Sequence, residues 1–184
     1  HQAARKGAGC DCLGLLRGLD DGGAEILGYQ YRRIVKMSAR GTAVVSAARG
    51  WIGTPYVHQA ARKGAGCDCL GLLRGIWREV VGQEPEAIPS YSMDWSEPQG
   101  DERLWRAALR HLSPKVLSDE APGDVLLFRM RSGAVAKHLG VAAEVGAQAS
   151  FIHGYSGHGV TESPLSLPWR RRIVARFEFP AEAI

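Results

Sequence analysis

The sequence lacks long hydrophobic runs and a recognisable export signal. No stretch of its 184 residues approaches the roughly 20 apolar residues that a membrane-spanning helix needs. Neither end shows a charged start followed by an apolar stretch and a small-residue cleavage site, so we expect no secretory signal peptide. A hydrophobic content of 45% with 23% charged residues is typical of a folded globular domain, not of a disordered or fibrous chain.

Cysteine is scarce, and its spacing argues against a disulfide framework. The four cysteines form two Cys-X-Cys pairs, Cys10 with Cys12 and Cys67 with Cys69, whereas a disulfide scaffold scatters its cysteines along the chain. Structural zinc sites usually place roughly two to four residues between paired cysteines, not one. A zinc-stabilised interaction module is therefore a weak alternative, and we expect neither a metal nor a cofactor.

Basic residues are concentrated in one place. The formal net charge is +4 at pH 7, and the dense basic stretch is "WRRRIVAR" at residues 169–176. A nucleic-acid-binding domain would gather more basic residues on one face, with aromatic residues between them. We interpret this stretch as an exposed basic edge strand and predict neither a nucleic-acid nor a membrane partner.

An internal repeat dominates the first part of the chain. His1–Gly18 is identical to His58–Gly75, letter for letter. Solenoid repeats diverge and need at least three units to bury a core, so one perfect copy indicates duplicated or added sequence instead. Met37 then opens a stretch that reads like a natural start. We predict that residues 1–36 lie outside the working domain and that residues 37–184 form it.

The predicted domain changes from helical spacing to strand-like alternation near its middle. Helices followed by an antiparallel sheet are the signature of an α+β fold. A loop rich in proline and serine separates the second helix from the third. We predict helices over residues 39–50, 69–81 and 101–112, and strands over residues 125–129, 138–145, 149–155, 159–163 and 171–179.

Cys69 is a candidate nucleophile because it follows a predicted helix cap. Asp68 is a natural N-cap, and the free N–H groups and dipole at a helix start favour the thiolate. Gly71 costs about 1 kcal/mol inside a helix, which indicates that another backbone or a substrate passes close to it. The alternative is that Cys69 is simply a small buried hydrophobic residue.

Two histidines are candidates for the base that a thiol nucleophile needs and for the partner that orients that base. His138 shares a strand face with Gly140 and Ala142, small residues that suit a face leaving room for a ligand. His153 lies in the next apolar strand. Side chains on one face of an antiparallel pair lie about 5 Å apart, so we predict that the two histidines are cross-strand neighbours. We expect the remaining candidates to be exposed: His111 and His158.

Five short blocks occur in an order that resembles the NlpC family of cell-wall cysteine peptidases. They span most of the predicted domain, from about Trp51 to Val160. This resemblance implies a compact papain-like enzyme that cuts the peptide stems of bacterial peptidoglycan. The blocks are "GTPY" at 53–56, "GCDCLGL" at 66–72, "PGDVLLF" at 122–128, "KHLGV" at 137–141 and "FIHGY" at 151–155.

The resemblance also implies a role for each matching residue. Cys69 corresponds to the nucleophile, His138 to the general base and His153 to the polar third member. Tyr56 corresponds to the tyrosine that lines the nucleophile, and Asp68 to the acid that helps to hold the amino end of the substrate. The bond cut would join γ-D-glutamyl to meso-diaminopimelate.

Two departures from the family pattern leave the stem-peptide preference open. Leu70 stands where the family commonly has serine, and "VHQAA" at 57–61 stands where it often has paired glycines. The combination "PYVHQA…GCDCLGLLRG" is more similar to the phage-tail subgroup, including tail peptidases of phage-like gene transfer particles. This similarity implies tail proteins as partners. It also implies synthesis in the cytoplasm without a signal peptide and action in the periplasm or cell wall as part of a virion.

Alternatives remain open for both the function and the repeat. The main alternative is a catalytically inactive structural tail component with the same fold; another is acyl transfer to an amine. Cys12 is the counterpart of Cys69 in the first copy, but that copy is not preceded by a "GTPY" block and the chain holds one set of histidine blocks. We therefore predict that Cys12 is catalytically idle.

Overall fold

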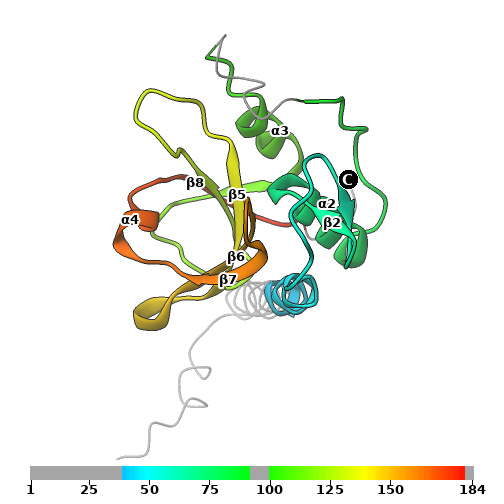
Figure 1. Cartoon of the computed structure of the whole chain (residues 1–184). Helices are drawn as coiled ribbons and strands as arrows, with labels where there is room; N and C mark the ends of the chain where they lie inside the picture. Colours follow the sequence, from blue (N-terminus) through cyan, green and yellow to red (C-terminus); the bar gives the residue numbers. More distant parts are fainter. Residues whose placement is uncertain (1–38, 92–99, 181–184) are drawn as a thin grey trace, which may run out of the picture. The chain divides into compact units, whose positions relative to one another are not determined.

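The computed structural model of the chain describes residues 39–91 and 100–180. Their centre is an antiparallel sheet with strand order β3-β8-β4-β5-β6-β7, and α2 and α3 lie on one side of it (Figure 1). The predicted extra segment at residues 1–36 lies outside the described residues, so its assignment stays a prediction. The strands of this sheet are β3 (Ser113–Lys115), β4 (Val125–Phe128), β5 (His138–Glu144), β6 (Ser150–Tyr155), β7 (Gly159–Pro164) and β8 (Ile173–Glu178).

The three predicted helices are present, and with the antiparallel sheet they confirm the α+β class. Residues 39–49 are helical, α2 spans Cys69–Val80 and α3 spans Arg103–His111. Helical spacing found them because each buries one stripe of apolar side chains against the sheet. Five short elements were not predicted, because segments of two to four residues show no periodicity unless, like β4, they are a continuous apolar run. They are β1 (Ala61–Arg62), β2 (Gly66–Cys67), a 3-10 turn (Gly146–Gln148), α4 (Leu167–Arg170) and the short strand β3.

Helix α3 begins two residues later than predicted. Its N-cap is Glu102, not Asp101, and the Glu102 side chain makes no capping hydrogen bond. Asp101 instead accepts a 2.9 Å hydrogen bond from the guanidinium of Arg103. Leu104 and Ala108 are buried, whereas Leu109 is 52% exposed.

The basic stretch before the C-terminus is not an exposed edge strand. β8 lies between β3 and β4, because the unpredicted strand β3 covers the edge that β8 would otherwise form. Arg176 of β8 is 2% exposed, and its guanidinium donates a 2.8 Å hydrogen bond to the buried carboxylate of Asp124. Lys115 of β3 reaches the other oxygen of Asp124 at 2.9 Å. These cations therefore stabilise the interior and are not available to a partner.

The sheet is covered on both faces, which explains the uninterrupted apolar run in β4. Alternate residues of that strand join different clusters: Val125 and Leu127 pack with the helices, while Leu126 and Phe128 join a second cluster. The Phe151 ring fills the space over Gly140, where an added Cβ would lie 2.7 Å from the ring. The small residues on that face of β5 thus make room for Phe151. The prediction that they leave room for a ligand is wrong.

The start of α2 is held tightly by the segment before it. An added Cβ at Gly71 would lie 1.8 Å from the carbonyl oxygen of Ala60, and one at Gly75 would lie 1.9 Å from the indole of Trp51. The expected close approach at Gly71 is therefore confirmed, and the neighbour is backbone. Both contacts set the position of α2 against the β1–β2 hairpin and the turn before it.

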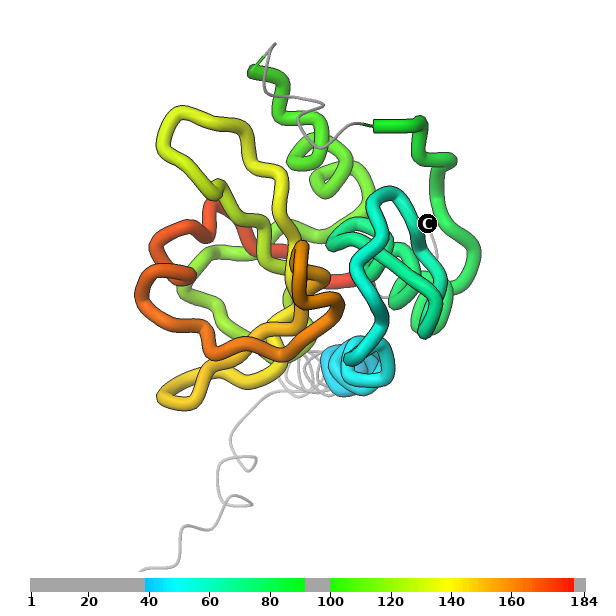
Figure 2. Tube along the Cα trace, viewed as in Figure 1, coloured from blue at the N-terminus to red at the C-terminus, as the bar shows by residue number. Residues whose placement is uncertain are grey.

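That turn is also tied to the far end of the sheet. The N–H of Gly53 donates to the carbonyl of Val160 at 3.0 Å, and the N–H of Val160 donates to the carbonyl of Thr54 at 2.9 Å. Figure 2 shows the two chain segments, in cyan and orange, converging beside the start of α2. The helix start, the turn and the strands that carry the histidines are thereby held together.

Candidate active site

Cys69 lies at the first position of α2, where the helix meets β5 and β6. Asp68 is the N-cap, and its Oδ1 accepts a 2.8 Å hydrogen bond from the N–H of Gly71. The Cys69 thiol reaches the carbonyl oxygen of Lys137, the residue before His138, with Sγ 3.9 Å from that oxygen. An added Cβ at Gly154 would lie 3.0 Å from the Asp68 carbonyl, so glycine lets β6 cross directly over the helix start.

The two predicted histidines lie within hydrogen-bond distance of each other. Nε2 of His138 is 2.8 Å from Nδ1 of His153. They are diagonal neighbours, because the register pairs Val141 with Ile152 and so brings Gly140, not His138, opposite His153. His138 is 9% exposed and His153 is 1% exposed. The pair is therefore shielded from water, and the Nδ1 of His138 makes no hydrogen bond within residues 39–91 and 100–180.

Ser163 and Trp169 complete the surroundings of the pair, and sequence reasoning missed both. The hydroxyl of Ser163, on β7, lies 3.1 Å from Nε2 of His153. The Trp169 ring lies 5.8 Å from the His138 ring and 5.3 Å from the His153 ring, centroid to centroid. Ser163 belongs to a polar stretch and Trp169 to the basic stretch, so neither carried a periodic signal. Phe128 and Phe151 close the same side.

This enclosure keeps both imidazoles neutral. Burial, followed by the proximity of His153, lowers the pKa of His138 to about 3. Burial, followed by the proximity of His158, lowers the pKa of His153 to about 4. Apolar surroundings disfavour the charged form of an imidazole, which explains the direction of both shifts.

The Cys69 thiol is also held in its neutral form, contrary to the prediction. Burial, with the adjacent Asp68 carboxylate, raises the pKa of Cys69 to about 12. The N–H groups of Leu139, Leu70 and Cys69 itself lower that pKa, as a helix start should, but they do not offset the burial. Although the side chain keeps partial exposure, the resting site thus holds a thiol and an imidazole.

Asp68 is buried among several donors, which bears on its predicted role at the amino end of the substrate. The residue is 2% exposed, and Oδ2 accepts hydrogen bonds from the N–H of Gln59 at 2.8 Å and from the hydroxyl of Tyr91 at 2.6 Å. Nδ1 of His58 lies 3.5 Å from the same oxygen. The role of Asp68 stays a prediction, and it requires Tyr91 to give way to the substrate.

Tyr56 lies near Cys69, and its role beside the nucleophile stays a prediction. Its backbone forms an isolated parallel bridge with Cys67, two residues before the nucleophile. Burial raises the pKa of the Tyr56 phenol, and the nearby Cys69 and Asp68 raise it further. A phenol that stays protonated can donate a hydrogen bond near the thiol.

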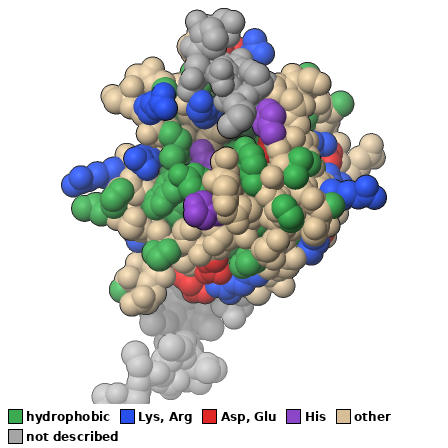
Figure 3. All heavy atoms as spheres, in the orientation of Figure 1, with side chains coloured by type: hydrophobic (Ala, Val, Ile, Leu, Met, Phe, Trp, Pro, Cys, Tyr) green, Lys and Arg blue, Asp and Glu red, His purple; other side chains and the backbone are tan. Residues whose placement is uncertain are grey.

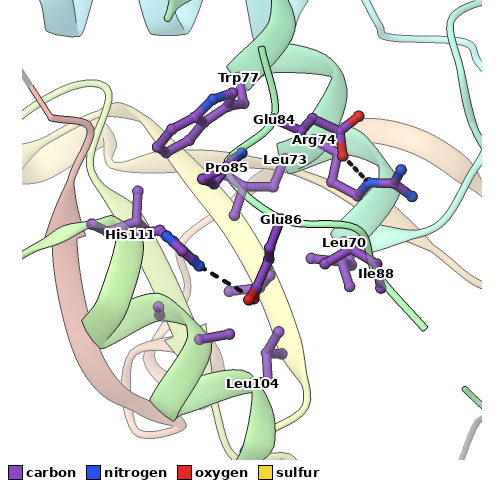
Figure 4. A pocket seen from close by; sticks show the side chains of 14 residues that line it. Leu70, Leu73, Arg74, Trp77, Glu84, Pro85, Glu86, Ile88, Leu104 and His111 are labelled. Carbon is purple, nitrogen blue, oxygen red and sulfur yellow. Dashed lines mark hydrogen bonds and ion pairs between the residues drawn. The ribbon is translucent and has the colours of Figure 1, made fainter. Parts of the chain in front are cut away.

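An apolar pocket lies between α2, α3 and the chain after α2 (Figure 4). Leu70, Leu73 and Leu139 line it, so the leucine that replaces the family's serine faces this pocket. His111 also lines it and lies 3.2 Å from the carboxylate of Glu86; it is partly buried, and the prediction that it is exposed is wrong.

His158 is exposed, as predicted, and stacks on Tyr155 with ring centroids 5.5 Å apart and planes 12° apart. On the face shown in Figure 3, hydrophobic side chains gather next to a surface histidine.

Within the described part of the chain, no group of three or more His, Cys, Asp or Glu residues is arranged to hold a metal ion. No helix in that part is long and apolar enough to cross a membrane.

No family model and no curated protein matches the sequence. Solved structures do match. They include a lipoprotein-like NLP/P60 family protein from Staphylococcus aureus (17% identity, TM-score 0.51, covering 77% of this chain and 41% of that one). An NlpC/P60 family protein from Bacillus cereus matches with 19% identity and a TM-score of 0.53, covering 76% of this chain and 40% of that one. NlpC2 from Trichomonas vaginalis matches with 20% identity and a TM-score of 0.51, covering 76% and 47% respectively.

The chain therefore has the fold of NlpC/P60 proteins, which confirms the fold that the sequence blocks predicted. It spans less than half the length of each of these solved proteins. Within that fold, the Cys69 thiol at a helix start lies 3.9 Å from the carbonyl oxygen of Lys137, and the next residue, His138, forms a buried pair of imidazoles with His153.

Proposed function

We propose that this chain is a cysteine peptidase that hydrolyses the peptide stems of bacterial peptidoglycan. One observation carries the proposal. In an NlpC/P60 fold, the Cys69 thiol at the start of α2 contacts the backbone of the residue before His138, and the His138 ring lies within hydrogen-bond distance of His153. A nucleophile, a base and a partner for that base are the three parts that thiol catalysis requires.

The neutral resting state determines the order of proton transfers. Sγ of Cys69 attacks the amide carbon while Nδ1 of His138 takes the thiol proton, because no thiolate is present beforehand. The resulting imidazolium gives that proton to the leaving amine. His138 then takes a proton from the water that hydrolyses the thioester, and returns it to the departing sulfur. The N–H of Cys69 would stabilise part of the charge on the carbonyl oxygen.

We also propose the bond and the setting that the sequence resemblance implies. The bond is γ-D-glutamyl to meso-diaminopimelate. The setting is a phage-like tail, whose proteins would be the partners and which would open the cell wall during DNA delivery. The segments at residues 55–60 and 66–75 support this setting through their similarity to the phage-tail subgroup. Mass spectrometry of purified phage-like particles from the native host tests it: peptides of this chain should be among the particle proteins.

Digestion of defined muropeptides by the full chain tests the activity. We expect Cys69→Ala to abolish product release, read by mass spectrometry of the fragments. The matched control is Cys67→Ala, which removes a fully buried thiol two positions earlier on β2 and should retain activity. Stems with lysine in place of meso-diaminopimelate test the choice of bond.

Three results would contradict the proposal. Undiminished release by Cys69→Ala would exclude this nucleophile. No release by the folded wild-type chain would favour an inactive structural component with the same fold. Products in which the acyl group is joined to an added amine would indicate acyl transfer.

A further inference from the structure

We propose that Ser163 is a positioning residue that sets the tautomer of His153 and, through it, determines which nitrogen of His138 can accept a proton. The three side chains form one line of contacts across β5, β6 and β7. Nε2 of His138 lies 2.8 Å from Nδ1 of His153, and Nε2 of His153 lies 3.1 Å from Oγ of Ser163. This inference rests on the proposed function, because it concerns the base of that reaction.

Each ring nitrogen of a neutral imidazole is either a donor or an acceptor, so the two contacts allow two arrangements. In the first, Ser163 accepts from Nε2–H of His153, and Nδ1 of His153 accepts from Nε2–H of His138. The lone pair of His138 is then on Nδ1, which can take the thiol proton. In the second, Ser163 donates and every proton is reversed, so that Nδ1 of His138 already carries a proton and cannot act as a base.

The reaction itself favours the first arrangement. Once His138 has taken the thiol proton, both of its nitrogens are donors, and Nδ1 of His153 must accept. His153 then carries its proton on Nε2, and the Ser163 hydroxyl is the acceptor within reach among the described residues. Ser163 is partly exposed, so its own proton can be donated to water while its oxygen keeps a lone pair for the imidazole.

The neighbouring strand offers a matched control. Thr161 lies two residues before Ser163 on β7, and the register pairs Thr161 with His153 and Ser163 with Phe151. Thr161 therefore carries a hydroxyl on the same face and with similar exposure, but that hydroxyl makes no hydrogen bond to the His153 ring. Replacing Thr161 by valine removes a hydroxyl without removing the contact that the proposal concerns.

The readouts must report the histidines and the thiol separately from peptidoglycan cleavage. Nitrogen-15 NMR of the histidine rings reports their tautomers. The rate of Cys69 alkylation by iodoacetamide, followed by mass spectrometry, reports the base. Because trypsin would cut the same peptide from residues 7–17 and 64–74, all variants should be made in a Cys10→Ser, Cys12→Ser background that shifts the mass of the first copy.

We expect Ser163→Ala to shift His153 toward the Nδ1–H tautomer and to slow Cys69 alkylation at neutral pH by about 10-fold, the lower end of the effect of removing the partner that orients a metal-binding histidine. Turnover of muropeptides should fall by a similar factor through kcat, with KM unchanged. Ser163→Thr keeps a hydroxyl and should retain both rates, and Thr161→Val should leave both rates unaltered.

Unchanged tautomers and alkylation in Ser163→Ala would overturn the proposal, as would an equal loss in Thr161→Val. The NMR and alkylation measurements need no peptidoglycan. A wild-type chain that is inert toward peptidoglycan but shows the expected shifts would therefore contradict the proposed function and leave the role of Ser163 standing.

Discussion

The Tyr91 hydroxyl donates a 2.6 Å hydrogen bond to Oδ2 of Asp68, the residue directly before the candidate nucleophile. Asp68 is also the N-cap of α2. Its carboxylate therefore caps the helix and also holds Tyr91, in the chain after the helix, by a hydrogen bond. Its second oxygen is the place where a substrate ammonium group would bind if the predicted role is right. Tyr91 and the substrate would then compete for that oxygen.

Tyr91→Phe should release Oδ2 of Asp68 and improve the binding of stems with a free amino end. We expect KM for such stems to fall while KM for N-acetylated stems stays the same, and the ratio of the two is the measurement. The lost hydrogen bond to a charged group should lower the free energy of unfolding by about 1.5 kcal/mol. An equal change in KM for both substrates would indicate that Asp68 does not bind the amino end.

The Cys69 thiol should react without a plateau near neutral pH. Because burial raises its pKa to about 12, the rate of alkylation by iodoacetamide should keep rising with pH beyond the range in which free cysteine, with a pKa of about 8.5, levels off. Free cysteine is the reference, and the Cys10→Ser, Cys12→Ser background isolates the site. A rate that levels off in mildly acid solution would instead reveal a preformed thiolate and imidazolium.

Acid should destabilise the domain through its buried histidines. The unfolded chain binds protons below the ordinary histidine pKa of 6.5, whereas His138 and His153 in the folded chain stay neutral down to about 3 and about 4. The free energy of unfolding should therefore be unaffected by this pair above pH 6.5. It should fall as the pH is lowered from there toward about 4, by at most about 1.4 kcal/mol per pH unit for each histidine.

Urea denaturation at a series of pH values measures this dependence. His153→Gln should reduce the slope because one of the two buried imidazoles is gone. His158→Gln, which replaces an exposed histidine and removes only the second cause of the His153 shift, should change the slope less than His153→Gln does. Equal slopes in wild type and His153→Gln would contradict the pKa shift.

Gly71→Ala should destabilise the fold although alanine is the better helix former. Its new Cβ would lie 1.8 Å from the Ala60 carbonyl oxygen, and backbone cannot move aside as a side chain can. Overpacking of this kind costs about 1–3 kcal/mol, more than the gain of about 1 kcal/mol in helix propensity. Gly50→Ala is the control, because its nearest neighbour is the flexible Lys63 side chain. Denaturant titration should show a clearly larger loss for Gly71→Ala, and equal losses would refute the packing argument.

Cys12→Ala should leave the rate of muropeptide cleavage intact. In the structure the second copy of the repeat supplies β1, β2 and the start of α2, with Cys69 beside β5. Cys12 lies outside the described residues, so this stays a prediction from the sequence. Activity lost in Cys12→Ala and retained in Cys69→Ala would show that the first copy fills that place.

Much of the fold was predictable because it depends on short-range patterns. The periodicity of α2 and the alternation in β5 and β6 located these elements to within a residue or two, and the Asp68 cap predicted where α2 begins. The position of β8 was not predictable in the same way. Whether a basic strand lies at an edge depends on a three-residue partner, β3, that is too short to show a pattern.

The candidate site was also predictable only in its local features. Residue type and order in the chain were enough to name Cys69, His138 and His153 as candidates, because a cap position and strand alternation are local properties. The protonation states of these side chains could not be predicted from the sequence, because a pKa depends on desolvation by segments far apart in the chain. Burial of the thiol outweighs the helix start, and this burial exists only once Lys137, 68 residues further on, and the strand β5 that follows it pack against α2.

By itself, the sequence determined where the longer helices and strands form and which side chains their ends carry, since these follow from periodicity and capping. The tertiary structure alone decided that the Tyr91 hydroxyl bonds to the Asp68 carboxylate and that the Ser163 hydroxyl lies beside the His153 ring. It also decided that the Cys69 thiol and the two imidazoles are neutral in the resting site. The physical reason is that hydrogen-bond partners and desolvation are set by distances in space, which adjacency along the chain does not specify.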